Sequence, residues 1–101
     1  MDLSHIHFHD TGILRVVEDT TNSTLTMEVE YPVDWERNVF ERRSLVFQNA
    51  HSYQVFEMAF HGPPTILDAA IVATEGRWQT VRLETNAGHR QVSCTSVVLT
   101  V

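Results

Sequence analysis

Residues 23–33 read STLTMEVEYPV, and this stretch decides the fold that the sequence predicts. Apolar and polar residues alternate along it, which is the period of a β-strand with one buried face. One face carries Leu25, Met27, Val29, Tyr31 and Val33, and the other carries Thr24, Thr26, Glu28 and Glu30. We therefore expect a half-buried strand whose threonines and glutamates face solvent.

The segments around this strand also have strand character. Residues 12–19 are rich in β-branched side chains, and the polar run DTTNS that follows predicts a hairpin loop, so the first two strands should be antiparallel neighbours. Residues 33–43 have no clean period and predict an irregular connection with one helical turn. The alanines of residues 65–76 are compatible with a short helix, but the β-branched residues favour a strand. The remaining predicted strands are residues 44–50, 52–60, 65–76, 77–85 and 90–101.

Together these segments predict one all-β domain over residues 1–101, an antiparallel seven-stranded sandwich or partly open barrel. A chain of 101 residues with 43% apolar content can bury a core that needs no disulfide or metal. Cys94 is the only cysteine, which excludes an internal disulfide and favours a reducing compartment. There is no signal-peptide pattern and no long apolar run, so we expect a soluble cytoplasmic protein with no membrane partner.

The charge balance is acidic and uneven. The formal net charge is −6, and all seven basic residues are arginines. This composition disfavours nucleic acid as a partner, because phosphate binding needs a basic surface. Residues 1–41 hold nine acidic residues against two arginines, so a basic protein partner or a cation would meet this half of the chain. The alternative is that the net charge only keeps the protein soluble.

Three of the six histidines occupy alternate positions in HIHFHD, residues 5–10. In an extended segment, His5, His7 and His9 would share one side, while Ile6 and Phe8 would point into the core. Two adjacent histidines of this set can share a zinc ion, but all three cannot, because the first and third Cα atoms would be ~13 Å apart. The alternative is an ordinary strand whose histidines face water and form a pH-sensitive patch.

A metal site built on two of these histidines needs a further ligand from elsewhere in the chain. Imidazole and carboxylate groups are the residue types that zinc accepts. The remote candidates are His51, His61, His89, Glu57 and Asp68, and no spacing in the sequence brings any of them close.

Three glutamates are candidates for an interaction surface. Glu28 and Glu30 share the outer face of the regular strand, where arginines of neighbouring strands are their expected partners. Glu57 interrupts the apolar run YQVFEMAF and would suggest function if it were buried. Strand alternation favours an outward Glu57, on one face with Tyr53 and Val55. The residues that would then face the core are Phe56, Met58 and Phe60.

No catalytic motif is present. There is no GxSxG elbow and no glycine-rich phosphate loop, and Cys94 lies within a predicted strand, where a small core residue is expected rather than a nucleophile. The large aromatic residues are dispersed and should pack in the core or at its rim. They are Tyr31, Trp35, Phe40, Tyr53 and Trp78.

The opening FHDTGILRVVED, residues 8–19, followed by TLTMEVEY, residues 24–31, resembles a loose group of small bacterial β-rich proteins. Members of that group begin with a His-Asp-led strand and an antiparallel meander, and some are classed as immunity proteins. The resemblance covers about the first third of the chain and rests on His9, Asp10 and the alternating apolar positions. It implies a bacterial, cytosolic protein of the binding kind, and it carries over no catalytic residues.

Three hypotheses of function follow. The first is a non-enzymatic module that binds a protein partner through its acidic half or a sheet edge. The second is a protein or enzyme that binds a divalent metal such as zinc through the N-terminal histidines. The third is a homo-oligomeric building block, because short all-β domains with uncovered edges often pair.

Overall fold

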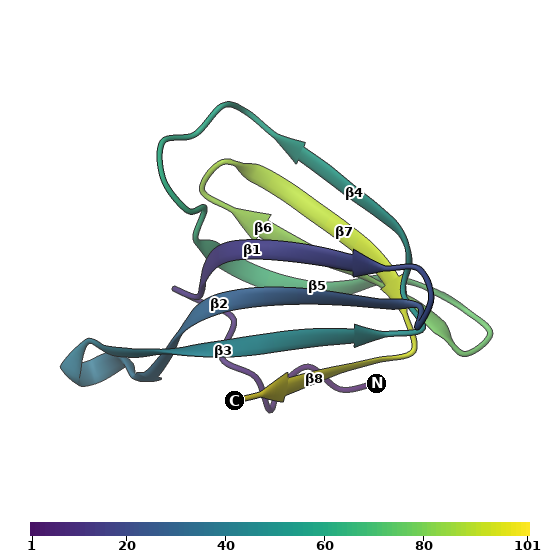
Figure 1. Cartoon of the computed structure of the whole chain (residues 1–101), viewed down its shortest axis with the longest axis horizontal. Coiled ribbons are helices and arrows are strands. Elements are labelled where there is room, and N and C mark those ends of the chain that lie inside the picture. The colour runs from purple at the N-terminus through teal and green to yellow at the C-terminus, as the bar shows by residue number, and fades with distance from the viewer.

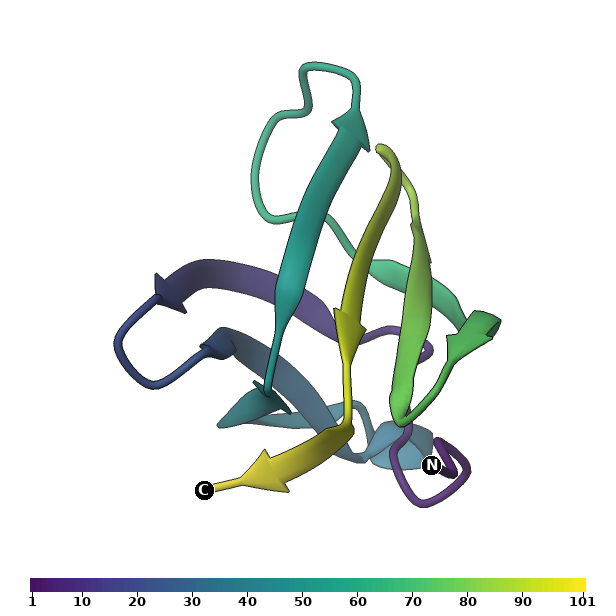
Figure 2. The ribbon, with the colours of Figure 1, turned by 90° about the vertical axis from the view of Figure 1, so that its right-hand side faces the viewer.

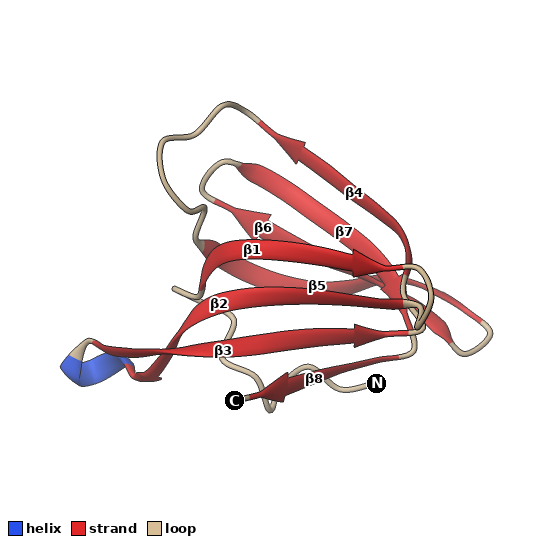
Figure 3. Ribbon diagram, viewed as in Figure 1, coloured by secondary structure: helices blue, strands red, loops and turns tan.

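The computed structural model covers residues 1–101 and shows a two-layer antiparallel β-sandwich rather than a closed barrel (Figure 1). Eight strands form two four-stranded sheets, with one 3-10 turn, η1 (Trp35–Arg37), as the only helical element (Figure 3). Sheet A has the order β1 (Gly12–Asp19), β2 (Thr24–Asp34), β3 (Val39–Gln48), β8 (Ser96–Thr100). Sheet B has the order β4 (His51–Glu57), β7 (Gly88–Cys94), β6 (Trp78–Thr85), β5 (Ile66–Glu75).

The alternation in β2 sets the inner face of sheet A. Leu25, Met27 and Val29 have no solvent-exposed surface, and their neighbours in sequence face outward. Leu25 lies opposite Phe47 of β3, and Met27 lies opposite Leu45, so the two central strands bury matching rows of apolar side chains. The predicted half-buried strand and its antiparallel hairpin with β1 are both confirmed.

Sheet B supplies the other half of the core. Val81 and Leu83 of β6 and Val92 and Cys94 of β7 are buried against sheet A's inner face, in one cluster of 14 apolar residues. The predictions that Cys94 packs in the core and that residues 65–76 form a strand are confirmed. The structure contains no helix with the length and apolar character needed to cross a membrane.

The two sheets exchange strands at their ends. The chain passes from sheet A to sheet B at Asn49–Ala50, between β3 and β4, and returns at Thr95, between β7 and β8. At another corner, the chain just before β1 is hydrogen-bonded to the start of β5, through Thr11 and Ile66. Seen from the side, the strands of sheet B rise steeply across those of sheet A (Figure 2).

The strand count differs from the prediction by one. Residues 90–101 were expected to form one strand, but the chain leaves sheet B after Cys94 and enters sheet A at Ser96. The backbone N–H of Thr95 donates to the carbonyl of Gln48, which holds this crossing in place. The consecutive polar residues Thr95 and Ser96 interrupt the alternation at this point, but the strand character on both sides of them predicted one strand where the structure has two.

Three other segments correct the sequence interpretation. The helical turn predicted within residues 33–43 is present, but β3 begins at Val39, so the second half of that connection is strand. Residues 5–10 form turns rather than a strand, because the N–H of Ile6 bonds back to Leu3 and Asp10 has a positive φ. Ile6 and Phe8 are nevertheless buried, as predicted. The strand predicted at residues 52–60 ends at Glu57.

Truncation of a core side chain on β3 tests this arrangement. Leu45→Ala should lower the free energy of unfolding by about 2–5 kcal/mol, because Leu45 is fully buried and a cavity would remain. Val98→Ala, on the adjacent strand β8 and partly exposed, should cost less than about 1 kcal/mol. Urea denaturation of both variants measures the difference, and equal losses would contradict the described core.

Candidate functional site

The three N-terminal histidines lie on turns between β2 and β5. The backbone N–H of His7 donates to the Tyr31 hydroxyl at 2.8 Å, and the His7 ring stacks on the Trp35 ring with centroids 6.3 Å apart. His9 Nδ1 bonds the carbonyl of Leu67 at 2.9 Å, while His5 is exposed. These contacts fasten the N-terminal segment across the edge of the sandwich.

This placement does not assemble a metal centre. The ring centroids of His7 and His9 lie 6.5 Å apart. Among the remote ligand candidates, only Asp68 lines the same shallow hollow as these two histidines. Nowhere in the structure do three or more His, Cys, Asp or Glu side chains come together as a group that could hold a metal ion. His7 Nε2 is buried and has no hydrogen-bond partner in the protein. The geometry therefore gives the zinc hypothesis no support.

Glu28 and Glu30 lie on the outer face of sheet A beside arginines from the flanking strands. Arg15 of β1 is 3.6 Å from the Glu28 carboxylate, and Arg42 of β3 is 3.6 Å from that of Glu30. Their cross-strand arginine partners are therefore as predicted. Because all four side chains are more than a third exposed, each ion pair contributes at most about 1 kcal/mol. The pairs also offset part of the negative charge that a basic partner would meet.

Glu57 faces inward, so its predicted solvent-facing position is wrong. Its carboxylate receives two hydrogen bonds of 2.8 Å from the Arg90 guanidinium of β7, and the two side chains are only 10% and 12% exposed. Thr85 donates to the same carboxylate at 3.1 Å, and Arg90 also donates to the Tyr53 hydroxyl at 3.0 Å. Every charge in this cluster has a partner, so it stabilises the fold rather than offering a free group for catalysis.

The local backbone makes room for this cluster. Gly88 lies directly opposite Glu57 and has a φ of +149°. A Cβ at this position would lie 2.1 Å from the carbonyl oxygen of Phe56. Only glycine permits so close an approach of β7 to β4.

Burial and pairing act in opposite directions on the pKa of Glu57. Burial raises it, but the hydrogen bonds and charge of Arg90, with the Thr85 bond, outweigh burial and hold the pKa below its ordinary value of 4.5. The ionised pair therefore contributes stability that is fully present above about pH 4.5. That contribution is lost as the pH falls through the lower, folded-state pKa.

The inward position of Glu57 leaves β4 as an edge strand with no exposed charge. Val55 and Phe56 are about half exposed, at 48% and 51%, and Phe56 stacks on His89 with ring centroids 4.8 Å apart. Beyond the strand, Met58 is 82% exposed and Phe60 is 46% exposed. Phe56, Met58 and Phe60 were predicted to face the core, and all three are exposed instead.

The other three sheet edges carry features that discourage pairing with another strand. β1 has an exposed arginine and a break in register, and β5 has two such breaks and the exposed Asp68. β8 is only five residues long. Natural sheets protect their edges by charges, bulges and short strands. The Gln54–Glu57 part of β4 is itself short and follows a register break at His51, but it carries no exposed charged side chain.

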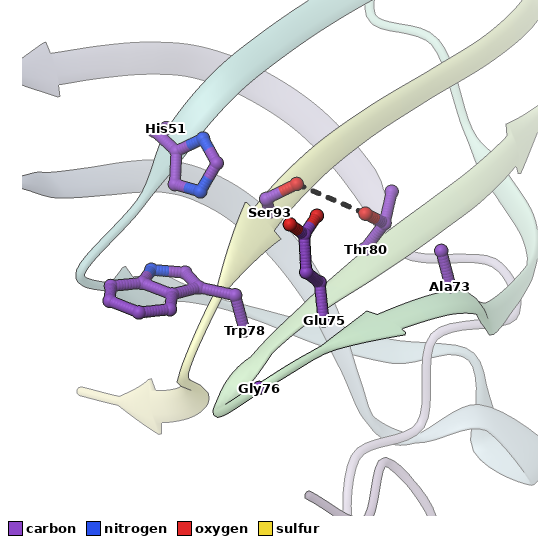
Figure 4. A pocket seen from close by; sticks show the side chains of 7 residues that line it. All are labelled: His51, Ala73, Glu75, Gly76, Trp78, Thr80 and Ser93. Carbon is purple, nitrogen blue, oxygen red and sulfur yellow. Dashed lines mark hydrogen bonds between the residues drawn. The ribbon is translucent and has the colours of Figure 1, made fainter.

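A cleft of about 400 Å³ lies on the outer face of sheet B (Figure 4). Its floor follows one row across the four strands, in which His51 pairs with Ser93, Ser93 with Thr80, and Thr80 with Ala73. The hydroxyls of Thr80 and Ser93 are 3.0 Å apart. The remaining lining residues, at the β5–β6 turn, are Glu75, Gly76 and Trp78.

Trp78 is fixed at the rim of this cleft. Its indole N–H donates to the carbonyl of Asn49 at 3.0 Å, and the Arg77 guanidinium lies 4.8 Å from its ring centroid. Sequence reasoning treated Trp78 as a packing residue and His51 only as a distant metal ligand. The polar residues at alternate positions of β6 and β7 indicated an outward-facing polar surface. The strand register that places His51 and Ala73 beside this surface cannot be obtained from the sequence.

Cys94 is not a reactive thiol. Its side chain has no exposed surface, and burial raises the pKa of the thiol to about 11. A nucleophilic cysteine needs a lowered pKa and access to solvent.

Comparisons with known proteins give no assignment. No model of a protein family matches the chain, and no curated protein matches it.

Replacement of Glu57 tests the buried ion pair. Glu57→Gln should lower the free energy of unfolding by about 3 kcal/mol near neutral pH, because it leaves the Arg90 charge largely buried and unpaired. Glu28→Gln, at an exposed pair, should cost less than about 1 kcal/mol. Chemical denaturation at several pH values should show the gap between the wild type and Glu57→Gln shrinking below pH 4.5. A gap independent of pH would contradict a lowered Glu57 pKa.

Proposed function

We propose that this protein is a non-enzymatic binding module that joins to a second copy of itself by antiparallel pairing of β4 with β4. The observation that carries the proposal is the uncharged, exposed edge of β4, flanked by half-exposed apolar side chains. Pairing would satisfy backbone groups that point away from β7 and would extend two copies of sheet B into one sheet.

A second copy suits this edge because the edge is self-complementary. In an antiparallel pair about a two-fold axis, each strand meets the same neutral residues, so no like charges oppose one another. Val55 and Phe56 of the two copies would cover one another and bury apolar surface that is now exposed. Glu57, the only carboxylate of the strand, is already neutralised by Arg90 and does not oppose the approach.

Pairing with a second copy is favoured over a basic protein partner and over a metal site by the surroundings of the residues that those two hypotheses use. Glu28 and Glu30 are paired with arginines, which weakens the argument for a basic partner at that face. The N-terminal histidines have no converging third ligand, which weakens the argument for metal chemistry.

The oligomeric state tests the proposal. Light scattering coupled to size-exclusion chromatography should give a mass that rises with concentration toward twice the 11.6 kDa of one chain. Val55→Lys should abolish the dimer, because a lysine on an edge strand opposes pairing. Val98→Lys is the matched control, since it places the same charge on the β8 edge and should leave the dimer intact.

Salt gives a second readout that needs no variant. Each copy carries a net charge of −6, so the copies repel one another at low ionic strength. Added salt should therefore raise the dimer fraction. A monomer at every concentration and salt, or equal effects of the two lysine variants, would contradict pairing through β4. Circular dichroism confirms that each variant is folded, and Phe56→Ser replaces Val55→Lys if the latter does not fold.

A further inference from the structure

The cleft on the outer face of sheet B combines an aromatic ring with polar groups from all four strands. Figure 4 shows the Glu75 carboxylate, the Ser93 hydroxyl and the His51 ring directed toward one space, with the Trp78 indole along its side. Ala73 and Gly76 also line the cleft, and the space stays open because neither residue has a large side chain. Its volume of about 400 Å³ lies in the range of small-ligand sites.

The polar groups of the cleft retain hydrogen-bonding capacity. Glu75 forms no ion pair with any residue of the chain. The Thr80 and Ser93 hydroxyls bond one another, and because each hydroxyl has one donor and two acceptor positions, capacity remains on both. His51 uses Nδ1 for the Ser52 hydroxyl and leaves Nε2 unengaged. The cleft therefore offers both donors and acceptors over a short distance.

We propose that this cleft binds a neutral saccharide unit. A sugar ring has an apolar C–H face, which suits the negatively polarised face of an indole, and a rim of hydroxyls, which each donate and accept hydrogen bonds. The Trp78 ring and the Glu75, Thr80 and Ser93 oxygens match these two requirements.

The charges at the rim favour a neutral ligand over an ionic one. Glu75 carries a negative charge inside the cleft, and Arg77 carries a positive charge against the Trp78 ring. The Glu75 carboxylate would repel an anion, and the Arg77 guanidinium, 4.8 Å from the indole centroid, would repel an organic cation placed on the ring. A neutral polyhydroxy ligand is repelled by neither the Glu75 nor the Arg77 charge.

This inference does not depend on the proposed dimer. The cleft lies on the face of sheet B, whereas pairing would use the outer edge of β4. Val55→Lys should therefore abolish dimerisation without changing sugar binding, so the two proposals can fail separately. If both hold, the joined sheets would carry two saccharide sites.

Fluorescence titration tests the inference. Trp78 is one of two tryptophans, so the Trp35→Phe variant makes it the sole tryptophan reporter. We expect saturable changes in its emission with at least one of D-glucose, D-galactose and N-acetylglucosamine, and none with choline chloride or sodium acetate at the same concentration. In NMR titrations, the chemical shifts of the Ser93 and Thr80 backbone amides should change with the same half-saturation concentration as the fluorescence.

Variants locate the binding in the cleft. Glu75→Gln or Ser93→Ala should weaken the sugar affinity about tenfold, because the first replaces a charged hydrogen-bond acceptor by a weaker neutral one and the second removes a hydroxyl. Glu84→Gln, on the outer face of β6 but outside the cleft, is the matched control and should leave the affinity unchanged. Absence of saturation with all three sugars would overturn the proposal. So would equal responses of Glu75→Gln and Glu84→Gln, or a saturable response to choline or acetate in place of the sugars.

Discussion

The rest of the structure depends on the burial of the inner faces of the paired strands β2 and β3 against sheet B. Leu25, Met27 and Val29 are removed from water completely, and each is held opposite a residue of β3 by the backbone ladder. A shift of one residue would turn every one of these side chains to solvent, so the apolar pattern fixes the register as well as the strand. Because β3 leads directly into β4, and β7 into β8, this sheet also sets where sheet B begins and where it returns.

Local patterns in the sequence were sufficient for the architecture. The period of two in residues 23–33, the DTTNS loop and the buried Ile6 and Phe8 all follow from which residues avoid water, and the structure confirms them. The passage at Thr95 between sheets was harder to predict, because the only mark in the sequence is the pair of consecutive polar residues Thr95 and Ser96 within a long run of strand character. The turns at residues 5–10 were not predicted because the alternating histidines follow the period of a strand, whereas the segment is held in place by contacts to residues distant in sequence, such as Tyr31 and Leu67.

The candidate sites depend on register, which a single sequence does not contain. His51, Ser93, Thr80 and Ala73 come from four different strands and meet only because their strands pair in that order. Glu57 was placed on the wrong face because Phe56, Met58 and Phe60 looked like its buried neighbours. Glu57 faces inward because the Arg90 guanidinium on the inner face of β7 would otherwise be buried without a carboxylate partner. The free-energy cost of such an unpaired charge exceeds the cost of leaving the apolar side chains exposed. Those apolar residues remain exposed as a consequence.

The irregularity in β4 connects the edge with the cleft. Ser52 has a φ of +56°, and the register shifts between His51 and Gln54. In an unbroken strand His51 would share the face of Tyr53, Val55 and Glu57, since all four positions differ by multiples of two. The bulge reverses the phase, so His51 joins the cleft on the outer face while Glu57 reaches Arg90 on the inner face. A single backbone distortion therefore supplies the cleft with its imidazole and removes the charge that would otherwise protect the edge of β4.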